Sequence, residues 1–337
     1  MYKSEIDIAV LILFFNRPAL LKKVFEQVKI ARPSRLYLFQ DGAREGRPDD
    51  VENVRKCREI VADIDWDCEV HINYQEKNNG CDPSEYISQK WMFETEEMGI
   101  ILEDDDVPSQ SFFPFCKELL EKYKDDDRIS MICGMNNTEV TDYCPYDYFF
   151  STTGSINGWA SWKRVIDTYD PDYKFLDDPY AFARLRENFN DKKRGFNRYI
   201  ETCKRHKASG REHYESILSA SMYLYDRLNV VPTKNMILNI GQDGESTHGA
   251  ASLDLLPKGV RRIFTMKTYE LEFPLKHPPY VMEDKQFLKD LSLVMGYGNR
   301  MVGIYRKFES LFYRFRAGGF SAIKKSLKLK KLKQVFK

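Results

Sequence analysis

The residues with the clearest chemical potential in this sequence are four consecutive acids, Glu103-Asp104-Asp105-Asp106. They follow the apolar run Gly99–Leu102, which is typical of a buried strand in a parallel sheet. Open α/β sheets bind their ligands at the carboxyl ends of such strands. Like charges gathered there are unfavourable unless a cation arrives, and Mg²⁺ is typically bound by one or two carboxylates together with phosphate oxygens. The quartet therefore indicates a site for a divalent cation carrying a diphosphate; the alternative is a solvated acidic turn.

Alternating strands and helices must position this quartet. The apolar runs predict strands at Ile8–Phe15, Arg35–Gln40, Cys68–Tyr74, Gly99–Leu102 and Ile129–Cys133. Helical patterns between them predict helices at Ala19–Lys29, Val51–Ala62, Pro83–Thr95 and Phe112–Lys124. This alternation predicts stacked βαβ units with right-handed crossovers. The predicted fold class is therefore α/β, with a mostly parallel central sheet flanked by helices.

Polar residues follow the first four predicted strands. They are Asn16-Arg17-Pro18, Gln40-Asp41-Gly42, Lys77-Asn78-Asn79-Gly80 and the acidic quartet. Each group alone is compatible with ordinary turn chemistry, since Asp-Gly and Asn-Gly are common turn dipeptides. Because the carboxyl ends of parallel strands meet at one edge of the sheet, their joint placement favours a nucleotide site there.

Several enzyme classes lack their sequence signature here. No Gly-x-Gly-x-x-Gly follows the first strand, which disfavours a Rossmann dinucleotide site. Neither a P-loop nor the Gly-x-Ser-x-Gly elbow of α/β-hydrolases occurs. The seven cysteines are odd in number and scattered without a Cys-x-x-Cys pair, so we expect a reducing cytoplasm. Ile8–Phe15 is too short to span a bilayer and lacks the flanks of a signal peptide.

The second half of the chain is more irregular and aromatic. In Gly158-Trp159-Ala160-Ser161-Trp162, the two tryptophans could form an apolar platform for a sugar, or could equally anchor a helix start in the core. Ile217–Tyr225 is expected to form a buried helix, and Asn235–Ile240 a further strand. A polar, glycine-rich loop containing His248 follows at Gly241–Gly249.

Taken together, spaced blocks over residues 5–255 resemble a GT-A-fold glycosyltransferase. The likeness is to the N-acetylglucosaminyltransferase I group and to bacterial family 2-like glycosyltransferases of surface polysaccharides. The blocks are Val10–Arg17, Gln40-Asp41, Ile101–Phe113, the Gly-Trp segment 158–162 and Pro232–Gly249. Ile101–Phe113 is the most specific, because the family has apolar residues, Glu-Asp-Asp and paired phenylalanines there.

The resemblance implies roles for the residues at the strand ends. Asp105 would hold Mg²⁺ or Mn²⁺, and Glu103 and Asp104 would face the sugar and ribose of the donor. Arg17 would approach the diphosphate or the base, and Asp41 the base. The neighbouring Asn16 and Asn79 would complete the nucleotide-sugar site. Asp106 stands where the family often has an apolar residue, and no role follows for it.

The resemblance also implies an acceptor side. Trp159 and Trp162 would bind the acceptor sugar. The family's general base is an Asp some residues before the Pro232 block, a stretch in which this sequence offers glutamates instead. Glu215 is the best match and Glu212 the second. His248 is a candidate second metal ligand, although a lone His in a polar loop is more often solvated.

The implied function is metal-dependent, inverting transfer of a sugar from a nucleotide-diphospho-sugar, with UDP favoured, to a hydroxyl of a glycan or lipid-linked saccharide. Residues 1–135 would form the nucleotide-sugar-binding half, residues 136–260 the acceptor-binding and catalytic half, and 261–304 a connection to the tail. One alternative is a sugar nucleotidyltransferase, which would need a glycine-rich loop after the first strand. Another is a non-catalytic saccharide- or membrane-binding protein that retains the fold.

The chain ends in a basic segment. From Tyr305 onward it has eleven Lys or Arg residues and Glu309 as its only acid, whereas residues 1–304 have 41 Lys or Arg against 50 Asp or Glu. Apolar residues recur in this segment at near-helical spacing, which is typical of an amphipathic helix at an anionic membrane. We therefore expect a tail over 305–337 and a peripheral location at the inner face of the cell membrane. The net acidic body argues against a nucleic-acid partner.

Overall fold

The computed structural model describes residues 2–189, 194–241, 257–296, 301–313 and 315–316. Its strands are β1 (Ile6–Phe14), β2 (Pro33–Gln40), β3 (Glu69–Tyr74), β4 (Met98–Glu103), β5 (Asp106–Pro108), β6 (Ile129–Cys133), β7 (Tyr148–Ser151), β8 (Trp159–Trp162), β9 (Leu228–Pro232) and β10 (Ile237–Asn239). Its α-helices are α1 (Pro18–Ala31), α2 (Pro48–Val61), α3 (Cys81–Met92), α4 (Phe112–Lys122), α5 (Lys163–Ile166), α6 (Pro179–Asn188), α7 (Arg194–Ser209), α8 (Tyr214–Leu224), α9 (Lys258–Arg261) and α10 (Lys285–Met295). Two 3₁₀ turns lie at Lys174–Asp177 and Arg262–Thr265.

One eight-stranded sheet organises the molecule, in the order β3-β2-β1-β4-β8-β6-β9-β7. β3, β2, β1 and β4 run parallel, as do β6 and β9, while β8 and β7 are antiparallel to their neighbours. A separate two-stranded ribbon pairs β10 with β5. The predicted fold class, an α/β protein with a mostly parallel sheet flanked by helices, is confirmed.

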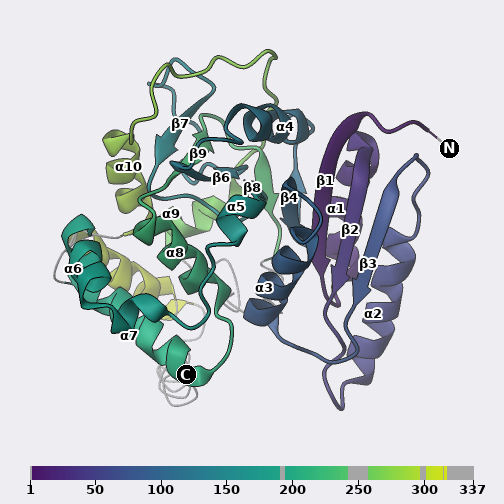
Figure 1. Cartoon of the computed structure of the whole chain (residues 1–337), viewed down its shortest axis with the longest axis horizontal. Helices are drawn as coiled ribbons and strands as arrows, with labels where there is room; N and C mark the ends of the chain where they lie inside the picture. Colours follow the sequence, from purple (N-terminus) through teal and green to yellow (C-terminus); the bar gives the residue numbers. More distant parts are fainter. Residues whose placement is uncertain (1, 190–193, 242–256, 297–300, 314, 317–337) are drawn as a thin grey trace.

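Helices cover both faces of this sheet, and the pleat of β1 divides the core between them (Figure 1). Side chains of a strand alternate between faces. Ile8, Val10 and Ile12 therefore pack in the cluster that contains α1, α2 and α4, whereas Ala9 and Leu11 pack in the cluster that contains α3, α7 and α8. Burial on both faces explains why β1 is an uninterrupted apolar run.

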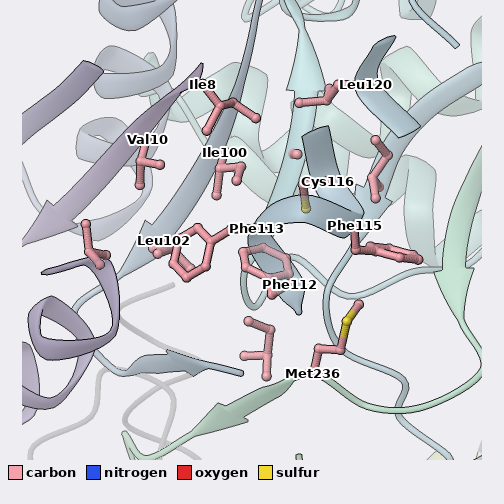
Figure 2. Packing of buried hydrophobic residues seen from close by; sticks show 14 of the residues in the cluster. Ile8, Val10, Ile100, Leu102, Phe112, Phe113, Phe115, Cys116, Leu120 and Met236 are labelled. Atoms are coloured by element: carbon pink, nitrogen blue, oxygen red, sulfur yellow. The ribbon is translucent and has the colours of Figure 1, made fainter. Parts of the chain in front are cut away.

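Helix α4 packs against the sheet beside the acidic quartet. Figure 2 shows Phe112 and Phe113, at its start, among side chains from β1 and β4 and beside Met236. Both phenyl rings are fully buried. Burial of rings of this size stabilises a fold by about 1.5–3 kcal/mol each. The paired phenylalanines therefore fix the chain just after the quartet.

The predicted elements of the first half agree with the structure to within three residues at either end. The Gly-Trp block forms strand β8 next to β4, and helix α5 begins directly after Trp162, so the alternative of tryptophans that anchor a helix start in the core agrees with the structure. The predicted connection at 261–304 contains α10, and its Phe287 and Leu291 are buried against the sheet. No described helix is long and apolar enough to cross a membrane.

Candidate functional site

The acidic quartet lies at the carboxyl end of β4, as the sequence predicts. Glu103 ends β4, Asp104 and Asp105 form the turn, and Asp106 begins β5. Asp104 and Asp106 are almost completely buried, and Asp105 is 7% exposed. A solvated acidic turn is therefore the wrong interpretation, and these carboxylates need partners inside the protein.

Arg17 supplies the positive charge. It stands between the end of β1 and Pro18, the first residue of α1, so the β1–β4 pairing carries it to the quartet. Its Nη2 pairs with Asp104 Oδ1, and its Nη1 lies 2.9 Å from Asp105 Oδ2. Burial opposes the charged guanidinium, but the two carboxylates outweigh this effect and raise the pKa of Arg17. The arginine is thus a permanent cation bridging two acids.

A second segment, far along the chain, covers Asp105. The register of β10 on β5 places Asn239 opposite Asp106. Asn239 Nδ2 then donates to Asp105 Oδ1 at 3.0 Å and to Asp106 Oδ1 at 3.2 Å. Gly241 follows so closely that a Cβ there would stand 1.9 Å from Asp105 Oδ2. Only glycine fits at this position while Asp105 keeps its place.

Asp106 connects neighbouring strands through hydrogen bonds. Its Oδ2 accepts a hydrogen bond of 2.8 Å from the backbone N–H of Gly158, which precedes β8. Gly158 has a φ of +58°, a conformation that glycine adopts without strain. Asp106 therefore ties β5 to β8 and β10, and the structure gives it the positional role that the sequence left open.

The quartet has a buried acidic neighbour in Glu85 of α3. Burial, together with nearby acids, raises the pKa of Glu85 to about 8 and that of Asp106 to about 8. Burial likewise raises the pKa of Asp104 to about 6, although Arg17 opposes the shift. The carboxyl of Glu103, desolvated and facing Glu85, has its pKa raised well above the ordinary value. The ligand-free site thus holds more acid than Arg17 neutralises, which is a condition that favours cation binding.

Glu85→Gln should stabilise the protein at high pH. A carboxyl whose folded pKa is raised contributes stability that is complete below its unfolded pKa and is lost as pH rises through the folded pKa. Glutamine removes this titration, and since Glu85 Oε1 is buried without a hydrogen-bond partner among the described residues, the amide breaks no bond there. We expect a gain of roughly 1–3 kcal/mol in the free energy of unfolding near pH 8, and less than about 1 kcal/mol near pH 5.

Urea unfolding at the two pH values measures this effect. Glu26→Gln, on the exposed face of α1, is the matched control and should show no pH-dependent difference. A Glu85→Gln protein less stable than wild type at both pH values would contradict the assignment of a raised pKa.

Asp41 organises a loop in this structure. Its two oxygens accept hydrogen bonds from the backbone N–H groups of Gly42, Asn79 and Gly80 at 2.8–3.0 Å and from the Asn78 amide at 2.8 Å. The predicted contact between Asp41 and a base therefore stays a prediction, whereas its role in holding residues 78–80 at the sheet edge is direct. Asn79 belongs to the same loop.

Asn16 lies to one side of the quartet. Its Nδ2 donates to Asp50 Oδ1 at 2.7 Å, and Arg44 Nε donates to Asp50 Oδ2 at 2.6 Å. The hydrogen bonds from Arg44 hold the pKa of the buried Asp50 carboxyl below its usual range. Asn16 thus ties the β1–α1 connection to the loop before α2, and its predicted contact with the donor stays a prediction.

The α7–α8 turn brings Glu215 toward the same edge. Arg211 Nη2 donates to the carbonyl of Asn79 at 2.8 Å, and His213 Nδ1 lies 3.0 Å from Asp82 Oδ2 at the start of α3. Glu215 is exposed in the first turn of α8.

Desolvation raises the pKa of the Cys81 thiol, although the residue as a whole is exposed, and carboxylates that include Glu85, Glu103 and Glu215 add to the shift. Burial raises the pKa of Tyr86, and the charge of Glu212 adds to that shift.

The tryptophans do not form a platform. Trp159 and Trp162 are 1% and 2% exposed. Trp162 Nε1 donates to the carbonyl of Leu120 at 3.0 Å, and Trp159 stacks near Tyr214 with ring centroids 6.3 Å apart. The predicted acceptor contact of these two rings is corrected: both belong to the core, because β8 lies in the interior of the sheet. His248 lies outside the described residues.

Few protein side chains at this site could serve as ligands for a metal ion. Across the described residues, no group of three or more His, Cys, Asp or Glu side chains is arranged to hold one. Glu103 is partly exposed and Asp105 is 7% exposed, and Asp105 Oδ2 faces Arg17 and the bare Cα of Gly241. A single carboxylate of this kind fits a cation whose remaining ligands are phosphate oxygens and water, as is usual for Mg²⁺.

Comparisons with known proteins do not assign a family. No protein-family model matches the chain, and no curated protein matches it significantly. Among solved structures, an inositol-1-phosphate CTP transferase from T. maritima is similar, with 11% identity, a TM-score of 0.38 and coverage of 78% of this chain and 96% of that chain. A UDP-glucose pyrophosphorylase complexed with UDP-glucose has 10% identity, a TM-score of 0.29 and coverage of 65% and 99%. At this level the likeness does not decide between nucleotidyl and glycosyl transfer.

Sequence reasoning missed three residues that shape this site: Glu85, Asn239 and Gly241. Asn239 and Gly241 fall at the junction of the predicted strand Asn235–Ile240 and the polar loop, so their place in the chain was visible, but their partner Asp105 was not. Glu85 gives no sequence signal, since an acid in a helix is ordinarily solvated.

Proposed function

We propose that this protein is a glycosyltransferase that binds a nucleotide-diphospho-sugar at the carboxyl edge of β1 and β4. The observation that carries the proposal is the bridge from Arg17 to Asp104 and Asp105. A fixed cation and a carboxylate that could bind a metal would then stand side by side at the edge where α/β sheets bind nucleotides, which supports the proposal. A diphosphate needs both kinds of group.

Different residues of the site would contribute to different parts of the transfer reaction. The leaving nucleoside diphosphate gains negative charge as the glycosidic bond breaks, and the guanidinium of Arg17 would stabilise that charge. Asp104 is held by Arg17 and by the backbone N–H of Phe15 at 3.3 Å, so it would present a fixed acceptor to donor hydroxyls. Glu103 lies beside it at the end of β4.

Asp105 would hold Mg²⁺ or Mn²⁺. When bound, such an ion supplies Lewis-acid stabilisation of the diphosphate. Asn239 restrains Asp105 from the opposite side through Oδ1. This restraint leaves Oδ2 as the oxygen directed at the ligand, once Arg17 turns to the phosphates.

Glu215 would serve as the general base. An acceptor hydroxyl is a poor nucleophile near neutral pH, and a carboxylate that removes its proton typically accelerates transfer by about 10²–10⁴-fold. Glu215 is exposed in the first turn of α8, next to the turn whose Arg211 and His213 contact Asn79 and Asp82. Direct displacement with one base inverts the anomeric centre. The acceptor class proposed is a glycan or lipid-linked saccharide.

Nucleotidyl transfer is the competing function. The two kinds of solved structure described above are named for that activity. Such an enzyme must hold a triphosphate, for which a glycine-rich loop supplies backbone N–H groups. Here the β1–α1 connection is Phe15-Asn16-Arg17, followed at once by Pro18 in α1. This short connection with a charged side chain favours a diphosphate donor.

Analysis of the products formed from UDP-sugars distinguishes glycosyl transfer, nucleotidyl transfer and non-catalytic binding. The protein is incubated with UDP-sugars and Mn²⁺, with and without pyrophosphate, and the nucleotides are resolved by chromatography. A glycosyltransferase releases UDP by transfer or slow hydrolysis and ignores pyrophosphate. A nucleotidyltransferase forms UTP, and only when pyrophosphate is present. A non-catalytic saccharide-binding protein yields neither product.

Two matched variants test the base. Glu215→Gln should lower UDP release by about 10²–10⁴-fold with unchanged donor affinity. Glu212→Gln, three residues earlier, should leave the rate unchanged. The reverse result would assign the base to Glu212. Full activity of both variants would show that neither glutamate is the base, and the UDP released by the wild-type protein would still test glycosyl transfer.

A further inference from the structure

The helical residues 301–313 are attached to the protein by their polar face (Figure 1, yellow). Arg306 Nη2 donates to the carbonyl of Leu293 in α10 at 2.8 Å. Glu309 Oε1 accepts a hydrogen bond of 3.2 Å from the first backbone N–H of α9, and a guanidinium of α9 stands 5.1 Å from the ring centre of Tyr313. A surface helix of a soluble protein usually turns its apolar face inward. This helix does the opposite.

The outward side forms an aromatic face, which we define as Ile304, Tyr305, Phe308, Leu311 and Phe312. At 100° per residue these five side chains fall within an arc of about 120°. Tyr305, Phe308 and Phe312 are 66%, 68% and 59% exposed. A contiguous apolar stripe of this kind on a soluble protein marks an interaction site.

Cations flank the aromatic face on both sides. Lys307 and Arg316 are exposed, and their positions on the helix border the arc at its two edges. The sequence that follows, residues 317–337, adds seven lysines and no acid. The sequence from Tyr305 onward is therefore strongly basic, although residues 1–304 are net negative.

We propose that the aromatic face docks on the surface of an anionic lipid bilayer. The apolar rings would enter the boundary between headgroups and acyl chains, and the flanking Lys and Arg would extend to lipid phosphates. Each basic residue near such a surface strengthens this attraction. This inference goes beyond the proposed glycosyl transfer, since it concerns a surface distant in sequence from the quartet.

A second copy of the chain fits this surface less well. A symmetric pairing of two aromatic faces would bring the flanking cations of one copy next to those of the other. Like charges so placed repel, whereas anionic lipid attracts them.

Vesicle co-sedimentation of the full-length protein tests the proposal. Wild type should pellet with vesicles of phosphatidylcholine and phosphatidylserine, should not pellet with phosphatidylcholine alone, and should release as salt is added. The double variant Phe308→Ser/Phe312→Ser should bind at least about tenfold more weakly, since burial of two rings is worth more than the 1.4 kcal/mol of a tenfold change.

Tyr180→Ser is the matched control, because Tyr180 is 74% exposed on α6 and far along the chain from the aromatic face. It should bind vesicles like wild type, and all variants should unfold at the wild-type temperature because the changed residues are exposed. Equal binding by the double variant, or no binding by wild type to anionic vesicles, overturns the proposal. A wild-type dimer in sedimentation that the double variant dissociates, without vesicle binding, would assign the face to a second copy.

Discussion

Gly241→Ala should lower the rate of nucleotide-sugar turnover by at least about 100-fold, the typical loss when a reacting group is displaced by about 1 Å. The added methyl would stand 1.9 Å from Asp105 Oδ2 and 2.8 Å from Asp105 Cγ. This carboxylate cannot simply turn away, because Arg17 and Asn239 each hold one of its oxygens. The methyl must therefore displace the acid that we assign to the metal–diphosphate.

UDP release in the presence of Mn²⁺ measures this loss. Gly303→Ala is the control, since a Cβ there would meet nothing nearer than a carbonyl oxygen at 3.9 Å. The Gly241→Ala protein should remain folded, as its near-ultraviolet circular dichroism would show. Wild-type turnover in Gly241→Ala would mean that the observed position of Asp105 is not the one used in the reaction.

Arg17→Met should destabilise the ligand-free protein by about 3–5 kcal/mol near pH 8, the usual cost of removing one partner from a buried ion pair. Asp104 and Asp105 would be left without their cation. Arg17 is among the causes that lower the pKa of Asp104, so its removal raises that pKa further above about 6. The folded protein then keeps a proton that the unfolded chain releases, and the deficit shrinks as pH falls toward about 5.

Urea unfolding across this pH range gives the test. Arg55→Met is matched in chemistry but breaks an exposed pair with Glu52, so it should change stability by less than about 1 kcal/mol. Arg17→Lys keeps the charge but cannot engage two carboxylates at once, and should fall between the two. If Arg17→Met matches wild-type stability near pH 8, the bridge contributes nothing to the fold.

Both variants address one property of the site: Arg17 neutralises part of the charge of its carboxylates from within the protein. Arg17 lies across the two carboxylates that a cation and a donor would use. Arrival of a diphosphate with a divalent ion would replace this pairing, since the ion would neutralise Asp105 and free the guanidinium for phosphate oxygens. Burial, together with the neighbouring acid Asp105, raises the pKa of Asp104 and Asp106, and a cation held by Asp105 would offset the contribution of that acid.

The order of strands and helices in the first half follows from the sequence because each element there has a clear local pattern of apolar residues. β1 and β4 are short apolar runs, and the intervening helices carry apolar residues at helical spacing. Since parallel strands end at one edge, the same pattern placed Arg17, Asp41 and the quartet together. The apolar-to-polar change from Leu102 to Glu103 located the end of β4 to within a residue.

The Gly-Trp block shows where such reasoning fails. Trp159 and Trp162 are separated by two small residues, a spacing shared by a strand, a helix start and an exposed platform. Pairing with β4 on one side and β6 on the other decides for a buried strand. That choice depends on neighbours distant in the chain, which no local pattern contains.

The sequence by itself determined that this is an α/β protein with an acidic turn at a strand end and a basic, aromatic tail. These features are local, because periodicity and charge are properties of neighbouring residues. Only the tertiary structure decided that Arg17 bridges Asp104 and Asp105, that Asn239 and Gly241 close over Asp105, and that Glu85 adds a buried acid. It also decided that the helical residues 301–313 present their aromatic face outward. Each of these depends on contacts between segments far apart in the chain, whose geometry is set by packing of the whole sheet.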